Sequence, residues 1–307
     1  MKQKEIRIFF TDFWGAFENE NNFISKILKQ SYTIILDPIN PQYLFFSSFG
    51  YKHLTYKDCV KIYYTGENIV PDFNLCDYAM AFQYIQFEDR YFRYPVYTFH
   101  PGFDELPNKS VHREKVLNRK FCNFVYTNSK AADPIREKFV HELSKYKKVD
   151  SGGRLLNNIG KSVDDKIAYI ENYKFTIAFE NSSVSGYTTE KMIDPMRVNS
   201  MPIYWGNPRV EEDFNKKSFV YVNDFPSIEA VINEIIRLDK DDDAYFQKLS
   251  EPWIEPDKIR RWQEELSDFL RSIIEQPISK ARRTTDYGFN KSYKKKQRII
   301  RLFNRFS

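Results

Sequence analysis

Residues 175–208 contain the side chains of this sequence that are best suited to chemistry. An apolar run there leads into a polar loop and then into a predicted helix, and Tyr187, Glu190 and Lys191 fall at the start of that helix. A helix N-terminus offers unpaired backbone N–H groups and a positive dipole end, which together favour phosphate. We therefore expect Lys191 to neutralise a diphosphate and Glu190 to accept hydrogen bonds from sugar hydroxyls. A glutamate in a first helical turn would also complement the helix dipole without any ligand.

A further carboxylate, Glu67, lies just beyond the predicted strand 60–64. The carboxyl ends of parallel strands are where α/β folds place their ligands. Glu67 is therefore our candidate for a general base, a role that contributes about 10² to 10⁴ in rate when a hydroxyl must lose its proton as it attacks. The alternative is that Glu67 simply ends a strand and bonds a loop amide.

Apolar runs of strand length alternate with segments of helical periodicity, which is typical of an α/β fold. The runs are almost continuously apolar, so we expect parallel strands that are buried on both faces. The predicted strands are residues 5–10, 32–36, 60–64, 78–82, 121–126, 175–179, 201–205 and 218–222. The predicted helices are residues 21–30, 133–146, 163–173, 188–197, 228–238 and 257–274, the last with Asp257 as its N-cap.

The chain of 307 residues is long enough for two ordinary domains. The polar stretch 145–160 interrupts the apolar pattern and is the best candidate for a boundary. We therefore expect an N-terminal domain of residues 1–148, a C-terminal domain of residues 149–290, and a basic tail of residues 291–307.

Composition narrows the class of protein. Residues 291–307 contain seven of the 47 Lys and Arg residues and no acid, so the other 40 face 42 acidic residues and the rest of the chain is about −2. A nucleic-acid groove across the fold is therefore not expected. The sequence shows neither a signal peptide nor a membrane-spanning run. Three cysteines are too few for a disulfide framework, so a cytoplasmic location is expected.

Several motifs of the sequence resemble those of glycosyltransferase family 10, the α1,3/4-fucosyltransferases. The motifs ENSSVSGYTTEK and PIYWGNP carry the most specific likeness. YYTGENIVPDFNLCDYAMAF, FCNFVYTNSKAADPIREKF and VDSGGRLLNNIG extend it over residues 60–225. The resemblance, which is to the bacterial members, implies a GT-B fold in which two Rossmann-like domains face a cleft. The C-terminal domain would hold GDP-β-L-fucose and the N-terminal domain would shape the acceptor site.

The family resemblance also implies roles for individual residues. Glu67 matches the proposed general base, and Asn181, Tyr187, Glu190 and Lys191 match donor-site positions. Arg154 falls in the glycine-containing stretch where the family has a phosphate-contacting arginine, with an uncertainty in register of about two residues. Lys191 and Arg154 would stabilise the charge that gathers on the departing GDP.

No metal site is expected, and no cofactor besides the donor substrate. The four histidines lack metal-binding spacing. Asp241, Asp242 and Asp243 are consecutive on a predicted helix start, so their side chains point in different directions and cannot converge on one ion. In the family, the helix dipole and basic side chains replace a divalent cation, although an added cation could still stimulate activity. Cys59 and Cys76 are expected to be buried small hydrophobic residues.

The tail, residues 291–307, has a polybasic first half and an apolar stripe. Ile299, Leu302, Phe303 and Phe306 share one helical face. Such a helix is typical of reversible binding to an anionic membrane surface. Contact with nucleic acid, or packing of the tail on its own domain, are the alternatives.

These observations favour an inverting α1,3-fucosyltransferase that moves fucose from GDP-fucose to the 3-hydroxyl of GlcNAc or Glc in a galactosyl disaccharide, as in Lewis-x-type or O-antigen glycans. It would act at the inner face of the cell membrane. The alternatives are a GT-B transferase for another nucleotide sugar, a noncatalytic membrane-tethered glycan-binding protein, or an adaptor driven by the tail. The acceptor, the choice between α1,3 and α1,4 linkage, and the oligomeric state are left open.

Overall fold

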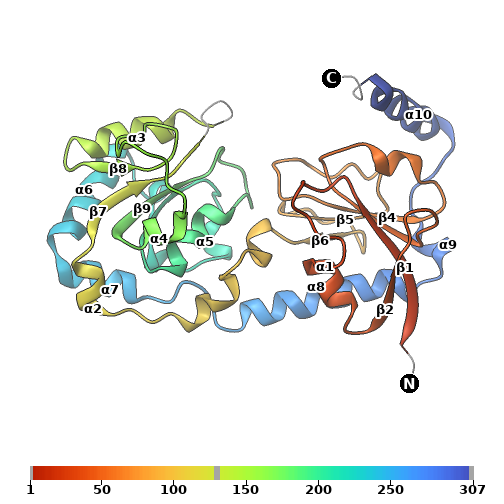
Figure 1. Cartoon of the computed structure of the whole chain (residues 1–307), viewed down its shortest axis with the longest axis horizontal. Coiled ribbons are helices and arrows are strands. Elements are labelled where there is room, and N and C mark those ends of the chain that lie inside the picture. The colour runs from red at the N-terminus through yellow and green to blue at the C-terminus, as the bar shows by residue number, and fades with distance from the viewer. Residues whose placement is uncertain (1–2, 128–131, 304–307) are drawn as a thin grey trace. The chain divides into compact units, whose positions relative to one another are not determined.

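The computed structural model describes residues 3–127 and 132–303, with side chains up to residue 300. The chain divides into two compact units. Unit 1 comprises the chain up to Tyr94 together with the segment from Arg260 onward, and unit 2 runs from Pro95 to Ile259. Each unit contains one sheet of parallel strands with helices packed around it (Figure 1). The predicted α/β class with parallel strands is therefore confirmed.

Unit 1 is built on a six-stranded sheet in the order β2-β1-β3-β4-β5-β6. All five strand pairs are parallel. The strands are β1 (Lys4–Thr11), β2 (Tyr32–Leu36), β3 (Tyr43–Phe46), β4 (Val60–Tyr64), β5 (Tyr78–Ala81) and β6 (Tyr91–Arg93). The helices are α1 (Phe23–Leu28), η1 (Lys52–Thr55), α8 (Lys258–Ile274), which begins at the end of unit 2, α9 (Ile278–Ala281) and α10 (Gly288–Phe303).

Unit 2 is built on a five-stranded sheet in the order β11-β10-β9-β7-β8. The strands are β7 (Lys120–Phe124), β8 (Val149–Ser151), β9 (Tyr173–Phe179), β10 (Met201–Trp205) and β11 (Val220–Tyr221). The α-helices are α2 (Arg113–Leu117), α3 (Ile135–Ser144), α4 (Lys166–Ile170), α5 (Glu190–Arg197), α6 (Ile228–Lys240) and α7 (Asp242–Ser250). The 3-10 helices are η2 (Val96–Phe99), η3 (Phe103–Asn108), η4 (Val210–Glu212), η5 (Lys216–Ser218) and η6 (Val222–Asp224). Every residue of β9 and β10 is buried, as expected for central parallel strands.

The division of the structure differs from the predicted boundary at residues 148 and 149. That boundary falls inside unit 2, because β7 and β8 on either side of it are neighbouring strands of one sheet. The polar stretch that suggested a linker contains the short edge strand β8 and its loop. Residues 260–290, predicted to belong to the C-terminal domain, join unit 1, where the amino group of Lys4 donates to the carbonyl of Ile274 at 3.1 Å.

Asp77 fastens the returning C-terminal segment to unit 1. Its side chain is buried just before β5, and one carboxylate oxygen accepts the backbone N–H of Lys61 at 2.7 Å. The other oxygen accepts the N–H groups of Arg283 and Thr284, each at 2.7 Å. One buried charge thus satisfies three backbone donors from segments far apart in the sequence.

Asp77→Ala is expected to lower the free energy of unfolding by about 3 kcal/mol, because three backbone N–H groups lose a charged acceptor. Urea denaturation would measure the change. Asp58→Ala removes an exposed carboxylate that pairs with Arg282 at 3.6 Å, and is the matched control, with an expected effect below about 1 kcal/mol. Equal stability of the two variants would contradict this role of Asp77.

Helix α10 includes the first part of the predicted tail. It packs near η1, where the Nε atom of Arg298 donates to the carbonyl of Leu54 at 3.0 Å. The hydroxyl of Tyr293 donates to the Oδ2 atom of Asp72 at 2.5 Å. Ile299 and Ile300 are 44% and 43% exposed. The side chains of Leu302, Phe303 and Phe306, which complete the predicted stripe, lie outside the described residues. None of the helices within 3–127 and 132–303 has the length and hydropathy of a membrane span.

Candidate active site

The loop between β9 and α5 holds most of the predicted donor-site residues. The buried strand β9 ends at Phe179, the loop follows, and Thr189 caps helix α5. The cap and the helix agree with the predicted helix of residues 188–197 to within two residues. Tyr187 is buried within the loop, whereas Glu190 and Lys191 form the first turn of the helix and remain partly accessible.

Glu180, which the sequence analysis did not single out, is a fully buried carboxylate beneath the start of α5. Its Oε1 atom accepts the N–H of Thr189 at 2.8 Å, and its Oε2 atom accepts the Thr189 hydroxyl at 2.8 Å. Burial raises the pKa of Glu180, and the Lys191 charge opposes that shift. Glu180 therefore fixes the position of the helix N-terminus.

The amino group of Lys191 lies among three acceptors. Its Nζ atom is 3.0 Å from the Thr189 hydroxyl, 3.2 Å from Glu190 Oε1 and 3.5 Å from Glu180 Oε2. Burial alone would lower the pKa of Lys191, but the two carboxylates outweigh it and raise that pKa. Burial would raise the pKa of Glu190, but the positive charges of Lys191 and Lys166 outweigh it and hold that pKa below its ordinary value. Lys191 is thus a fixed, permanently charged cation at a helix N-terminus.

Asn207 joins the PIYWGNP motif to the donor loop. This fully buried side chain accepts the N–H of Gly186 at 2.7 Å, and its amide donates to the Thr188 hydroxyl at 3.2 Å. Gly206, the residue before it, must be small, because a Cβ atom there would lie 2.6 Å from the Cγ atom of Glu180. The two motifs therefore form one structure.

Asn181 has a protein partner in the structure. Its Oδ1 atom accepts a hydrogen bond from the guanidinium of Arg136 at 2.7 Å, and the same guanidinium donates to the carbonyl of Phe179 at 3.2 Å. Arg136 is itself buried and lies over the ring of Tyr126 at 4.3 Å. Contact of Asn181 with a donor stays a prediction, whereas its contribution to the shape of the loop is visible.

Arg154 is exposed in the loop that follows β8. A Cβ atom on the preceding Gly153 would lie 1.9 Å from the carbonyl oxygen of Tyr126, and the N–H of Leu155 donates to that oxygen at 2.9 Å. Tyr126 in turn lines a cavity of about 10 Å³ together with Lys191. The Arg154 loop and Lys191 are thus joined through Tyr126.

Glu67 belongs to unit 1, where it lies beyond the C-terminal end of β4 as predicted. Its side chain is exposed, and its backbone N–H donates to the hydroxyl of the buried Thr65 at 3.1 Å. Among the described residues, no hydrogen bond or ion pair engages the Glu67 carboxylate. The carboxylate is therefore available to a ligand.

Other sequence-based expectations concern metals and thiols. Within the described parts of the chain, no three His, Cys, Asp or Glu side chains gather as metal ligands, and the absence of a metal requirement stays a prediction. Asp241 caps α7 by accepting the N–H of Ala244 at 2.9 Å, in agreement with its predicted place at a helix start. Cys59 and Cys76 are buried and free, as expected, and burial raises the pKa of Cys59 to about 11.

Two units that each contain a parallel sheet, with a cation fixed at a helix N-terminus of the second, are typical of the GT-B fold. A model of the α-(1,3)-fucosyltransferase FucT N-terminal domain matches residues 8–100, and the glycosyltransferase family 10 (fucosyltransferase) C-terminal model matches residues 115–275. The chain belongs to glycosyltransferase family 10. The predicted family and fold are therefore confirmed.

Individual relatives agree with this assignment. Alpha-(1,3)-fucosyltransferase FucT of Helicobacter pylori is 34% identical over 293 residues, which cover 80% of this chain and 60% of that protein. The chain thus spans about 60% of the length of this relative. The crystal structure of an α1,3-fucosyltransferase with GDP-fucose superposes with a TM-score of 0.75 at 31% identity, covering 90% of this chain and 92% of that one. Human GDP-fucose protein O-fucosyltransferase 3 is 32% identical over 141 residues, or 42% of this chain and 29% of that protein.

Proposed function

We propose that this chain is an inverting α1,3-fucosyltransferase. It transfers L-fucose from GDP-β-L-fucose to the 3-hydroxyl of GlcNAc or Glc in a galactosyl disaccharide such as N-acetyllactosamine, in the building of bacterial surface glycans. The observation that carries the proposal is the fixed Lys191 cation at the start of α5, in a chain of this family that superposes on a structure solved with GDP-fucose.

On the donor side, the diphosphate of GDP-fucose would bind at the N-terminus of α5. Lys191 would neutralise it, and the charge gained by the departing GDP would strengthen this contact toward the transition state. Arg154, on an exposed loop anchored to Tyr126, would supply a second cation. Glu190, with its lowered pKa, stays ionised and would accept hydrogen bonds from sugar hydroxyls.

On the acceptor side, Glu67 would act as the general base. A direct displacement that converts a β-linked donor into an α-linked product inverts the configuration at C1 of fucose. The attacking hydroxyl must lose its proton during this step. The proton would go to the Glu67 carboxylate while the C1–O bond to GDP breaks. The bond between the acceptor oxygen and C1 forms on the opposite face of the sugar ring. In this proposal Lys191, Arg154 and the N-terminus of α5 stabilise the departing GDP in place of a metal cofactor.

Mass spectrometry of the purified protein with GDP-fucose, with and without N-acetyllactosamine, tests the proposal. We expect the acceptor to gain one deoxyhexose, with the linkage then assigned by NMR. GDP release without a fucosylated product would keep the donor and overturn the acceptor. Neither product nor GDP release would overturn the function, and a competition series of nucleotide sugars would then identify another donor.

We also propose that α10 and the residues after it hold the enzyme on an anionic membrane surface at the cytoplasmic side. Tyr293 and Arg298 attach α10 to the rest of unit 1. Ile299 and Ile300 are left exposed on the same helix as the exposed Lys295 and Lys296. An amphipathic helix with this distribution is suited to the interface between headgroups and acyl chains.

Lys295→Glu with Lys296→Glu is expected to weaken binding to vesicles that contain phosphatidylserine by about 30-fold or more, since each cation contributes about 1 kcal/mol. Sedimentation with vesicles would measure the change. Lys26→Glu with Lys138→Glu makes the same change of charge at exposed sites of α1 and α3, and should leave binding nearly unchanged. Equal binding of both variants would contradict the role of α10.

A further inference from the structure

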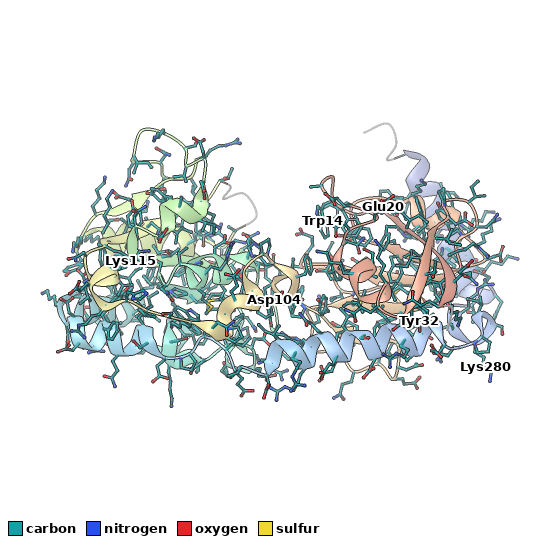
Figure 2. All side chains as sticks on the ribbon, turned by 60° about the horizontal axis from the view of Figure 1, so that its bottom comes forward. Trp14, Glu20, Tyr32, Asp104, Lys115 and Lys280 are labelled. Carbon is teal, nitrogen blue, oxygen red and sulfur yellow. The ribbon has the colours of Figure 1, made fainter. Side chains whose placement is uncertain are left out.

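Aromatic side chains that are exposed or half-buried gather at the carboxyl end of the unit 1 sheet, where β1 and β3 end. Phe49 is 51% exposed just after β3, and its ring centroid lies 6.4 Å from that of Trp14, at an angle of 77°. Trp14 is in the loop that follows β1 (Figure 2). Since β1 and β3 are parallel neighbours, the loops that follow them both lie at the carboxyl end of the sheet.

These two rings rest on a rigid support. Phe13 and Phe17 stack with a centroid distance of 3.9 Å, and Trp14 packs edge-on against Phe17 at 5.1 Å. The N–H of Phe49 donates to the carbonyl of Asp12 at 3.0 Å, which ties the loop after β3 to the loop after β1. The aromatic side chains are therefore held in place rather than carried on a free loop.

A continuous path of contacts leads from the rings to Glu67. Ser48, the neighbour of Phe49, lies with its hydroxyl 3.4 Å from that of Thr65. The Thr65 hydroxyl accepts the N–H of Glu67 at 3.1 Å. The aromatic rings and the proposed base thus lie at the carboxyl end of one sheet, in the loops that follow the adjacent strands β1, β3 and β4.

Further apolar surface flanks Glu67. Ile69 and Val70 are 44% and 66% exposed in the loop that follows it. Contiguous exposed apolar surface beside polar groups marks interaction sites, and ligand sites are lined mainly by apolar and aromatic side chains with a few polar groups. An acceptor sugar presents the complementary surface, with C–H groups on one face of its ring and hydroxyls at its rim.

We propose that Trp14 and Phe49 form a stacking platform for the galactosyl ring of the acceptor. The inference rests on the proposed function and specifies its acceptor subsite. In β-galactose the axial 4-hydroxyl lies on one face, so the hydrogens on C3, C4 and C5 make the other face continuously apolar. That face stacks on one of the two rings, and the other ring, inclined at 77° to the first, borders the sugar. The neighbouring GlcNAc or Glc unit then presents its 3-hydroxyl to Glu67.

Phe49→Leu and Trp14→Leu test the platform, because leucine keeps apolar bulk and removes the aromatic face. We expect each to lower kcat/KM for N-acetyllactosamine about tenfold, while kcat/KM for the monosaccharide N-acetylglucosamine and KM for GDP-fucose stay within about twofold. Phe289→Leu changes an aromatic residue that is 79% exposed on α10, and is the matched control. Thermal melts would verify that each variant is folded.

Saturation-transfer NMR on the unmodified protein gives a second test that no folding defect can disturb. The strongest transfer is expected at the galactose protons on C3, C4 and C5, and strongest transfer at the N-acetyl group would overturn the platform. The platform would also be overturned if the wild-type protein transfers fucose and the Phe49→Leu variant keeps the full preference for the disaccharide over the monosaccharide. A wild-type protein that neither transfers fucose nor releases GDP would instead overturn the proposed function on which the platform rests.

Discussion

Replacing Glu67 by alanine is expected to lower the rate of fucosyl transfer by about 10²-fold or more while GDP-fucose binding stays nearly intact. The carboxylate is exposed beyond β4 in unit 1, whereas the cation and helix N-terminus suited to the diphosphate belong to unit 2. Removing the base therefore leaves the donor contacts untouched. Single-turnover assays with saturating acceptor, combined with calorimetry of GDP binding, would separate the two effects.

Two further variants make the Glu67 experiment decisive. Glu67→Gln keeps the size and hydrogen-bonding capacity of the side chain but cannot take a proton, so it should be nearly as slow as Glu67→Ala. Glu105→Ala removes another exposed glutamate, on η3, and should leave transfer unchanged. Turnover of Glu67→Gln close to that of the wild type would remove Glu67 from the role of base.

Apolar runs predicted eight of the eleven strands of the described residues, including the edge strand β2, and missed β3, β6 and β8, which have three or four residues each. The continuous apolar run at 175–179 predicted a central parallel strand, and every residue of β9 is buried. β8, in contrast, contains only three residues, one of them Asp150, within a polar stretch. A polar edge strand and a linker have the same pattern in sequence, which is why the predicted domain boundary fell inside unit 2.

Periodicity predicted a buried face for α8 but not its place in the fold. Ile259, Leu266, Leu270 and Ile273 form an apolar stripe at helical spacing in the sequence, and all four are buried. An apolar stripe predicts that one face of a helix is buried. It does not predict which element covers that face, because the covering element is distant in sequence. Here the helix starts at the end of unit 2 and continues into unit 1, where Tyr32 donates to Glu275 just after the helix at 2.8 Å.

Within the candidate site, the residues at the helix start could be predicted and their supports could not. Lys191 and Glu190 stood out because charged side chains at a helix N-terminus have a recognised chemistry. Glu180 begins the ENSSVSGYTTEK motif and Asn207 lies in PIYWGNP, but neither motif shows their supporting role, since burial and reciprocal hydrogen bonds become visible only in three dimensions. The sequence signals for Glu180 were its place directly after a fully apolar strand and its position at the start of that motif.

Lys191→Ala is expected to weaken GDP binding about 10²-fold and to slow transfer as well, because the diphosphate loses its charged hydrogen-bond donor. The same change leaves the buried Glu180 without its cation, so it should also lower the free energy of unfolding by about 3 kcal/mol. Burial already raises the pKa of Glu180, and losing Lys191 raises it further. The folded variant would therefore take up a proton that the unfolded chain does not, and its loss of stability should shrink as the pH is lowered.

The double variant Lys191→Ala with Glu180→Gln separates folding from binding. The neutral amide removes the unpaired buried charge, so stability in urea should recover, whereas GDP affinity should stay low because the cation is still missing. Lys191→Arg keeps the charge and should retain more GDP affinity than alanine. If the double variant bound GDP as tightly as the wild type, Lys191 would be a structural counter-ion of Glu180 rather than a ligand of the diphosphate.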